Sequence, residues 1–157
     1  MSLMETYRLA RHDEERSRLR RVLALRGLIA TGRSQREVAQ MLGVSQPAVS
    51  QQLAVDLLAR VDEPAQLVDA AAPVLTKIAA ERGFSDLAVY GSVARHEARA
   101  DSDIDLLVTP PPGATIADML QLQAVLERVL GRRVDLTSRR GLRSPLDDDV
   151  LREAVAL

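Results

Sequence analysis

The sequence predicts an α/β (α+β) protein in two parts, an all-α N-terminal domain and a second domain with a mixed β-sheet flanked by helices. Two observations support this fold class. Apolar residues recur at helical spacing through the first sixty residues, and short, largely apolar strands follow only after residue 86. We therefore expect a helical domain over residues 1–62 and a mixed domain over residues 63–157, with the boundary at the VDEP sequence of residues 61–64.

Charge is divided between the same two parts. Residues 1–60 contain ten Lys and Arg against six Asp and Glu, whereas residues 61–157 contain eleven against sixteen. This asymmetry makes nucleic acid a candidate partner of the first part, although an uneven surface charge without function would look the same.

The composition limits the core and the cellular setting. With one Phe, two Tyr and no Trp among 157 residues, the core must consist of Leu, Val, Ala and Ile. The chain has no cysteine, which excludes disulfides and thiolate metal sites. No apolar run approaches the length of a membrane span, and the N-terminus does not resemble a signal peptide. We expect a cytoplasmic protein that does not contact a membrane.

Three helices are predicted in the first part. The first covers residues 12–31, because its apolar residues recur at helical spacing, and Gly32 ends it. The second covers residues 35–42 between a capping box, Ser34 with the glutamate three residues later, and the terminating Gly43. The third begins after Ser45 and extends to about residue 60.

Residues 34–53, SQREVAQMLGVSQPAVSQQL, resemble the helix-turn-helix of bacterial transcriptional regulators. Ala39 is small where two helices must cross closely, and Gly43 stands at the turn, where glycine most easily adopts a left-handed backbone. The apolar residues expected to form the seam between the helices are Val38, Leu42, Val44, Val49 and Leu53. The alternative is a helical hairpin that serves only packing or dimerisation.

If this segment binds DNA, the recognition helix begins near Gln46. The residues expected to face base edges are Gln46, Ser50 and Gln51, and glutamine can pair with adenine through two hydrogen bonds. Residues 46–59 contain no Lys or Arg, so phosphate contacts must come from Arg33, Arg36 and the arginines before Gly27. Such a single copy would bind weakly, and we expect a homodimer on a two-fold symmetric operator.

The second part is expected to alternate helices with strands. Helices are predicted over residues 65–72, 74–82, 115–130 and 147–156, and strands over residues 87–90, 104–109 and 133–137. Pro73 is expected to begin the second of these helices. Three consecutive aspartates, residues 147–149, are interpreted as the N-terminus of the last helix rather than as metal ligands.

The most informative segment is GSVARHEARADSDIDLLV, residues 91–108. A Gly91-Ser92 turn that opens a helix presents backbone N–H groups to an anion. Asp103 and Asp105 are two residues apart at a strand, so their carboxylates point to the same side. Carboxylate oxygens suit Mg²⁺, which usually completes its shell with water and substrate phosphates. The segment therefore predicts a site for a nucleoside triphosphate.

This segment, followed thirty residues after Asp105 by RVDL, resembles the minimal nucleotidyltransferase family of the polymerase-β-like superfamily. The resemblance covers about residues 73–157, and the residues that carry it are Gly91, Ser92, Ala94, Arg95, Ser102, Asp103, Asp105 and Asp135. Two residues depart from the family pattern: His96 replaces a usual glycine, and Tyr90 stands where Phe is common.

The resemblance implies roles for these residues. Asp103 and Asp105 would hold Mg²⁺ against the triphosphate of ATP. Asp135 would bind a second metal ion or act as the base toward an acceptor hydroxyl. Gly91 and Ser92 would bind the β- and γ-phosphates, and Arg95 would either contact phosphate or pin the acidic loop.

Members of this minimal family are often antitoxins paired with a HEPN-domain ribonuclease toxin, and some transfer AMP from ATP to the toxin. The first hypothesis is therefore a Mg²⁺-dependent nucleotidyltransferase antitoxin that also represses its own operon. The second is a transcriptional regulator without catalysis, whose nucleotidyltransferase-like domain senses a nucleotide. A transferase for small molecules is less favoured, because only twenty-two residues follow Asp135 to build an acceptor pocket.

Overall fold

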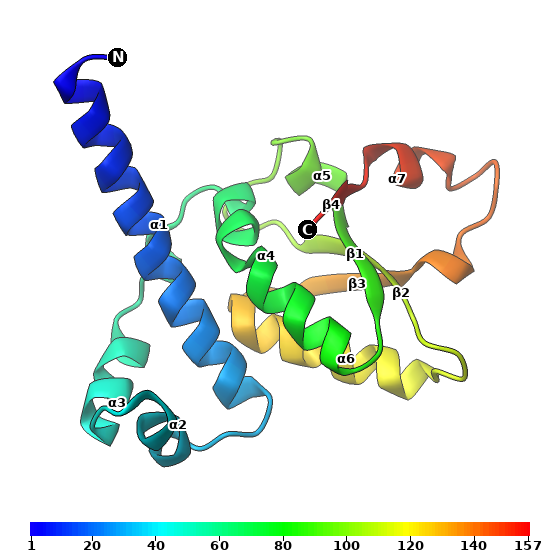
Figure 1. Ribbon diagram of the computed structural model, residues 1–157. Helices are drawn as coiled ribbons and strands as arrows, with labels where there is room; N and C mark the ends of the chain where they lie inside the picture. Colours follow the sequence, from blue (N-terminus) through cyan, green and yellow to red (C-terminus); the bar gives the residue numbers. More distant parts are fainter.

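A computed structural model describes all 157 residues of the chain. Figure 1 shows a group of helices beside a sheet that carries its own helices. The helical part contains α1 (Leu3–Ala30), α2 (Gln35–Leu42), α3 (Gln46–Ala54) and the 3₁₀ helix η1 (Leu58–Arg60). The second part contains α4 (Pro64–Glu81), β1 (Ser85–Tyr90), α5 (Gly91–Ala94), β2 (Ile104–Thr109), α6 (Ile116–Leu130), β3 (Val134–Ser138), η2 (Arg139–Gly141), α7 (Asp148–Glu153) and β4 (Val155–Ala156).

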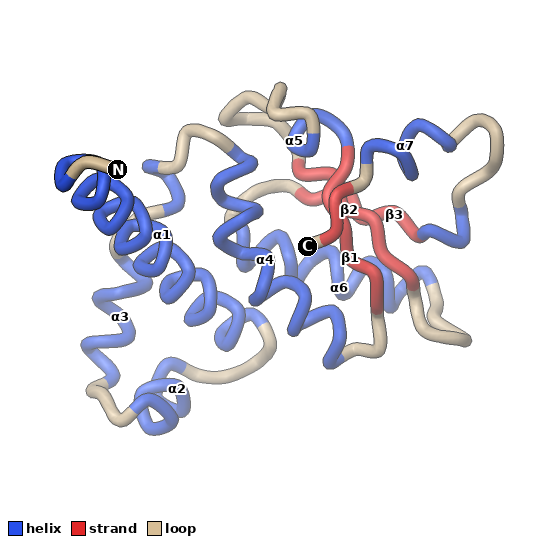
Figure 2. The backbone as a smooth tube through the Cα atoms, turned by 45° about the horizontal axis from the view of Figure 1, so that its top comes forward, coloured by secondary structure: helices blue, strands red, loops and turns tan.

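Four strands form one mixed sheet in the order β3-β2-β1-β4. Strand β1 runs antiparallel to β2 and β4, and β2 runs parallel to β3. Helices α4 and α6 lie on one side of the strands and α7 lies on the other (Figure 2). A mixed sheet flanked by helices was predicted for this part of the chain, and the structure confirms it.

Local signals explain where several elements begin and end. Ser34 forms the expected capping box with Glu37 before α2, and Gly43 ends that helix in a left-handed conformation with φ of 68°. Thr115 forms a second capping box with Asp118 at the start of α6. The observed bounds of α2 and β2 are those predicted.

The core is aliphatic, as the composition requires. Twenty-four buried residues form one cluster between the sheet, α4 and α6, and Phe84 is its only aromatic member. Strand β2 is central and contributes Ile104, Leu106 and Val108, all fully buried. None of the helices combines the length and hydrophobicity that a membrane crossing needs.

Helix α1 belongs to both parts of the molecule. Its residues Leu19, Leu23 and Ala30 join the large core, whereas Leu25 joins a small cluster with residues of α2 and α3. The Arg26 guanidinium donates to the carbonyl oxygens of Arg128 at 2.6 Å and of Val129 at 2.7 Å, in the last turn of α6. Arg20 donates to the carbonyl oxygen of Ala70 in α4 at 3.0 Å.

These contacts correct one expectation about the arginines before Gly27. Arg20 and Arg26 were included among the residues expected to contact DNA phosphates, but both are hydrogen-bonded to backbone carbonyls of the second part. Arg8, Arg18 and Arg21 of the same helix are exposed and form no ion pair, so they are free to meet a phosphate.

Two predicted helices of the first part have different bounds in the structure. Helix α1 begins at Leu3 rather than residue 12, behind a capping box of Ser2 and Glu5. Helix α3 ends at Ala54 instead of continuing to residue 60. The Asp56 carboxylate accepts a hydrogen bond from the N–H of Ala59 at 3.0 Å, a local turn that competes with helix continuation.

Pro73 does not begin a helix but lies inside α4, which is continuous from Pro64 to Glu81. Proline removes one backbone hydrogen bond from a helix interior. Buried residues on both sides of Pro73, among them Leu67 and Leu75, anchor α4 in the core, and this packing outweighs the lost bond. The tertiary contacts of α4 could not be recognised from its local sequence.

The structure also differs from the prediction at the C-terminal helix and at the apolar seam between α2 and α3. Helix α7 ends at Glu153, because Val155 and Ala156 pair with Val89 and Ala88 of β1 as an additional strand. Val38 and Val49 of the expected seam are fully buried, but two other members of that seam are not. Leu42 and Val44 are 52% and 43% exposed, at the outer end of the turn between α2 and α3.

Candidate active site

The turn between β1 and α5 lies against the carboxylate of Asp105. Gly91 has φ of 69°, a left-handed conformation that favours glycine. A β-carbon at this position would overlap Oδ2 of Asp105 and lie 3.3 Å from its Cγ. Helix α5 follows at once and is anchored by the buried Val93. The structure therefore brings Gly91 and the adjacent Ser92 next to the Asp105 carboxylate.

Two carboxylates stand side by side on neighbouring strands. Asp105 of β2 is directly in register with Asp135 of β3 in the parallel pair. Burial raises the pKa of Asp105, and the charges of Asp135 and Asp103 raise it further, while Arg95 acts in the opposite direction. Asp105 is half-buried, and Asp135 is exposed. The site is thus an acidic cluster in which the negative charges repel one another.

Asp103 lies just before β2 and is exposed. Its Oδ1 atom is 3.9 Å from Nε of Arg133, which comes two residues before Asp135. The turn that leads to Asp103 is shaped by Ser102, whose hydroxyl accepts a hydrogen bond from the N–H of Arg99 at 2.9 Å. This bond gives the serine of the Ser-Asp-x-Asp motif a structural role.

The donor set fits Mg²⁺ bound by two carboxylates. No three His, Asp or Glu side chains of the chain form a group that could hold a metal ion. Asp103, Asp105 and Asp135 therefore do not form a closed three-carboxylate cage. Mg²⁺ normally takes one or two carboxylates and completes its shell with water and phosphates. Asp103 and Asp105 would provide those two ligands, and a cation there would relieve the repulsion around Asp105.

Tyr90 forms part of this site, although its role could not be recognised in the sequence. It is in register with Asp105, and its hydroxyl group shares a hydrogen bond of 3.0 Å with Oγ1 of Thr137 in β3. Burial raises the pKa of Tyr90, as do the charges of Asp105, Asp135 and Asp147, while the bond to Thr137 lowers it. The ring therefore lies beside the acidic cluster, across β2.

Asp147 is the second residue near the acidic cluster whose proximity the sequence did not indicate. It is the first of three aspartates interpreted as a helix terminus, and α7 does begin at Asp148. Its carboxylate accepts a hydrogen bond from the N–H of Arg143 at 2.7 Å, and its charge acts on Tyr90. Chain order alone could not reveal this proximity, because more than fifty residues separate Asp147 from Tyr90.

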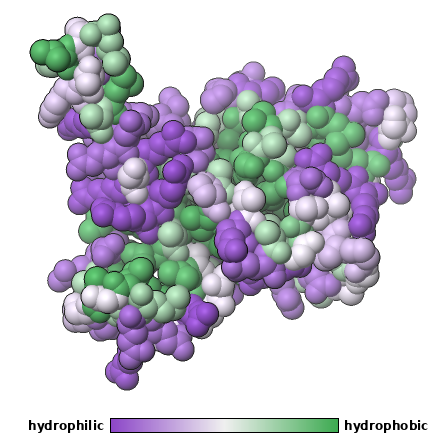
Figure 3. Space-filling model, in the orientation of Figure 1, coloured by the Kyte–Doolittle hydropathy of each residue, from purple (hydrophilic) through white to green (hydrophobic).

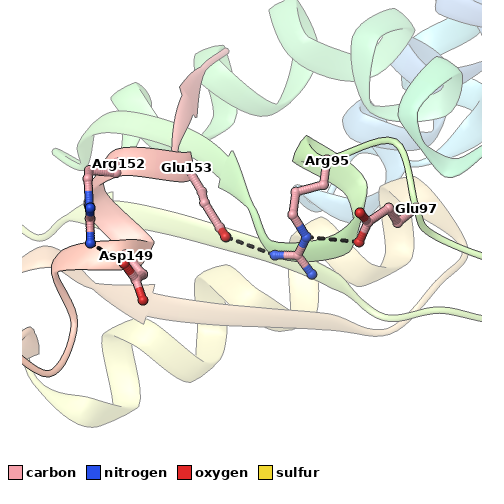
Figure 4. A network of polar contacts seen from close by, with 5 residues as sticks. All are labelled: Arg95, Glu97, Asp149, Arg152 and Glu153. Carbon is pink, nitrogen blue, oxygen red and sulfur yellow. Dashed lines mark hydrogen bonds and ion pairs between the residues drawn. The ribbon is translucent and has the colours of Figure 1, made fainter.

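Arg95 is held between two glutamates in Figure 4. Its Nε atom donates to Glu97 at 3.0 Å and its Nη1 atom to Glu153 of α7 at 2.9 Å. The bond to Glu97 and the charge of Glu153 raise the pKa of Arg95. Asp149 and Arg152 form a separate ion pair within α7. Neither partner is Asp103 or Asp105, so both roles expected for Arg95, contact with phosphate and pinning of the acidic loop, stay predictions.

Residues 75–157 match the family model described as polymerase beta, nucleotidyltransferase. The chain belongs to this family. The chain is 40% identical over 73 residues to the protein adenylyltransferase MntA of Thermococcus cleftensis, and this match covers 46% of the chain and 74% of MntA. It is 37% identical over 83 residues to a candidate protein adenylyltransferase of Methanocaldococcus jannaschii, and this match covers 53% of the chain and 85% of the relative.

A solved structure of a candidate minimal nucleotidyltransferase is also similar. It has 44% sequence identity and a TM-score of 0.55, and the match covers 59% of this chain and 95% of the other. The chain is therefore an enzyme of the nucleotidyltransferase class. The family match begins at residue 75, so the helical part lies outside it.

The loop of the nucleotidyltransferase between α5 and β2 contains an unusual backbone conformation. His96, which replaces a glycine usual in the minimal family, has φ of 56°. The same loop is tied to distant segments by Arg132, which donates to the carbonyl oxygens of Ala100 and of Val61, the latter at 3.1 Å. One guanidinium thus connects the acidic loop to the segment that joins the two parts.

Of the residues expected to contact DNA, Arg36 lies on α2, three lie on α3, and Arg33 lies in the turn between α1 and α2. Helices α2 and α3 lie away from the sheet that carries the acidic cluster (Figure 1). Arg33, Arg36, Gln46 and Gln51 are exposed, and Ser50 is half-buried. The Gln46 side chain donates to Oε1 of Gln35 at 2.8 Å, which links the first turns of the two helices. DNA binding by these residues stays a prediction.

Proposed function

We propose that this nucleotidyltransferase is a Mg²⁺-dependent protein adenylyltransferase that transfers AMP from ATP to another protein in the cytoplasm. The observation that carries the proposal is the placement of the Asp105 carboxylate against the Gly91 turn and beside Asp135. The proposal is supported by relatives that are named protein adenylyltransferases.

The proposed reaction uses this acidic cluster. Asp103 and Asp105 would hold Mg²⁺, which neutralises phosphate charge in nucleotidyl transfer. Gly91 and Ser92 would bind the β- and γ-phosphates, together with Arg95 if it leaves Glu153. The oxygen of an acceptor hydroxyl attacks the α-phosphorus, the bond to pyrophosphate breaks, and pyrophosphate leaves.

In this proposal Asp135 receives the proton of the acceptor hydroxyl, and its exposure and its register with Asp105 support that role. The alternative role is as ligand of a second metal ion. The two roles can be distinguished by varying the Mg²⁺ concentration. Substitution of Asp135 lowers the apparent affinity for Mg²⁺ if Asp135 is a metal ligand, but not if it is only the base.

A macromolecular acceptor is favoured over a small molecule. Strand β4 adds to the sheet edge rather than covering the site, and the side chains of Asp103 and Asp135 are exposed. Such an open site is accessible to a protein that supplies its own contact surface. A HEPN-domain toxin is the acceptor that the family resemblance suggests, and the protein would then act as its antitoxin.

The helical part would make the same protein an autorepressor. In this part of the proposal, Gln46, Ser50 and Gln51 contact bases of the operator, while Arg33 and Arg36 contact phosphates, with two copies on a two-fold symmetric site. Exposure of four of these five side chains supports it. Binding should weaken steeply with salt, because it depends on phosphate contacts.

The test is transfer of label from ATP labelled at the α-phosphate, with Mg²⁺ and host lysate as the source of acceptor. The Asp103→Asn/Asp105→Asn variant is the control, since it removes both proposed ligands of the cation. Label on one protein band with the wild type only supports the proposal. Equal labelling by the variant, or no labelling despite bound ATP, contradicts it.

A second candidate function is a nucleotide-sensing regulator without catalysis. The sharing of α1 between both cores and the Arg132 contact to Val61 favour it, because they provide a physical connection between the acidic loop and the helical part. In that case ATP changes the affinity for operator DNA while the ATP concentration stays constant. Production of pyrophosphate in the same assay contradicts this alternative.

A further inference from the structure

The N-terminal half of α1 extends away from the rest of the molecule. All residues from Met1 to Arg18 are exposed, and Leu19 is the first buried residue of the chain. The first ion pair to another element is that of Arg16 with Asp69 of α4, at 2.7 Å. We call residues 3–15 the free arm. It forms the projecting end of α1 in Figure 1 and the upper left projection in Figure 3.

Little within the monomer stabilises the free arm. A helical segment of this length is marginal in water unless it packs against something. The arm has a capping box at Ser2 and one exposed ion pair, Arg11 with Glu15 at 3.3 Å. It also exposes large apolar side chains, with Met4 at 60% and Tyr7 at 61%. These properties are typical of a helix that packs against a partner.

A cavity of about 360 Å³ lies directly beside the base of the arm, between α1, η1 and α4. Its apolar lining consists of Leu19, Leu57, Val61 and Ala70. Polar and charged side chains form the rest, and the charged ones contributed by α1 and η1 include Glu15, Arg18 and Arg60. The cavity therefore combines an apolar floor with a charged rim, which suits an amphipathic helix.

The charge pattern of α1 is complementary to itself in one antiparallel arrangement. Met4, Arg8, Glu15 and Leu19 are spaced four, seven and four residues apart, so they share one face of the helix. If two copies of α1 pair antiparallel with the centre between residues 11 and 12, Arg8 lies opposite Glu15 of the second copy. Met4 then lies opposite Leu19, at the apolar floor of the second copy's cavity.

We propose that the free arm packs along this cavity of a second copy of the chain, so that two molecules form a two-fold symmetric antiparallel pair. Both arms and both cavities are occupied at once, as a closed two-fold interface requires. The dimer does not depend on AMP transfer. It goes beyond the proposed function by assigning the interface through which two helical parts could act together on DNA.

Charge reversal tests the register of this pair. In size-exclusion chromatography with light scattering, we expect the wild type at twice its mass of 17.2 kDa. Arg8→Glu alone and Glu15→Arg alone should each be monomeric, because each creates two like-charge contacts per dimer. An equimolar mixture of the two variants should restore the dimer, because both contacts are then complementary. Asp13→Arg, on another face of the arm, is the matched control and should remain dimeric.

A monomeric wild type at tens of micromolar, single variants that stay dimeric, or a mixture that stays monomeric would each overturn the proposal. The substituted side chains are exposed, and circular dichroism checks that the variants fold. Crosslinking is a second measurement, since the chain contains no cysteine. His12→Cys lies at the centre of the pair and should form a disulfide-linked dimer on oxidation, whereas Asp13→Cys should not. Equal crosslinking of both variants also contradicts the proposed register.

Discussion

Gly91 and Asp105 are in such close contact that a side chain at position 91 would displace the Asp105 carboxylate. A β-carbon there would overlap Oδ2 of Asp105 and lie 3.3 Å from Cγ, and φ of 69° already disfavours any other residue. The contact holds a half-buried carboxylate against the turn proposed to bind phosphate. Glycine is therefore favoured at position 91 both by the left-handed backbone conformation and by the lack of space beside Asp105.

Gly91→Ala should therefore impair both folding and catalysis. The left-handed backbone costs about 1–2 kcal/mol of unfolding free energy, and displacement of Asp105 should reduce AMP transfer at least about 100-fold, as a lost transition-state contact does. Gly113→Ala is the matched control, because Gly113 has φ of 79° with no atom within 4 Å of the added carbon. Urea unfolding should show similar losses for both variants. Equal activity of the two would contradict the role of the contact.

Removing the charge of Asp105 should stabilise the metal-free protein. Burial and two neighbouring carboxylates raise the pKa of Asp105, so its ionised form opposes folding above that pKa, and the cost disappears as pH falls through it. Asp105→Asn should raise the thermal midpoint at pH 7 without Mg²⁺ and lose this advantage near pH 4. Addition of Mg²⁺ should stabilise the wild type only. A lower midpoint for the variant at pH 7 would be inconsistent with this electrostatic account.

His96 should tolerate glycine better than other substitutions. It adopts φ of 56°, which costs a residue with a β-carbon about 1–2 kcal/mol relative to the right-handed region, and β-branched residues suffer most. His96→Gly should leave the unfolding free energy unchanged or raise it, whereas His96→Val should lower it by about 1 kcal/mol or more. Chemical denaturation measures both. A stabilising valine would show that this loop relaxes into another conformation.

The roles of Arg95 can be separated by kinetics. Arg95→Ala should raise KM for ATP about tenfold, since an arginine that leaves Glu153 for phosphate contributes a charged hydrogen bond. Glu153→Gln should lower KM, because it removes the competitor for the same guanidinium. If Arg95 only pins the loop to α7, both substitutions should instead reduce kcat in parallel. Steady-state assays at varied ATP distinguish the two patterns.

Arg26 should be important for stability, although it lies far from the acidic cluster. Its two hydrogen bonds to the end of α6 join α1 to the second part. Arg26→Met should reduce the unfolding free energy by about 2 kcal/mol, as expected for charged hydrogen bonds left unmade. Because α1 contributes residues to both hydrophobic cores, the chain should unfold in one transition. Two separate transitions in calorimetry would show that the parts fold independently.

The elements that could be predicted from the sequence are those with local signals. Ser34 with Glu37 and the left-handed Gly43 determine the ends of α2 through backbone capping, which involves only neighbouring residues. The apolar run of β2 and the Asp-x-Asp spacing are equally local, so the strand and its pair of carboxylates could be predicted from the chain. Gly91 followed by Ser92 identified the turn for the same reason.

The tertiary structure decided everything that depends on which segments meet. Tyr90 joins the site only because β1 lies beside β2 in a register that aligns it with Asp105. The C-terminal residues form β4, and α4 continues through Pro73, because contacts with distant segments outweigh the local preferences. Residues far apart in the chain meet through packing, and no short stretch of sequence contains the partners that stabilise such contacts.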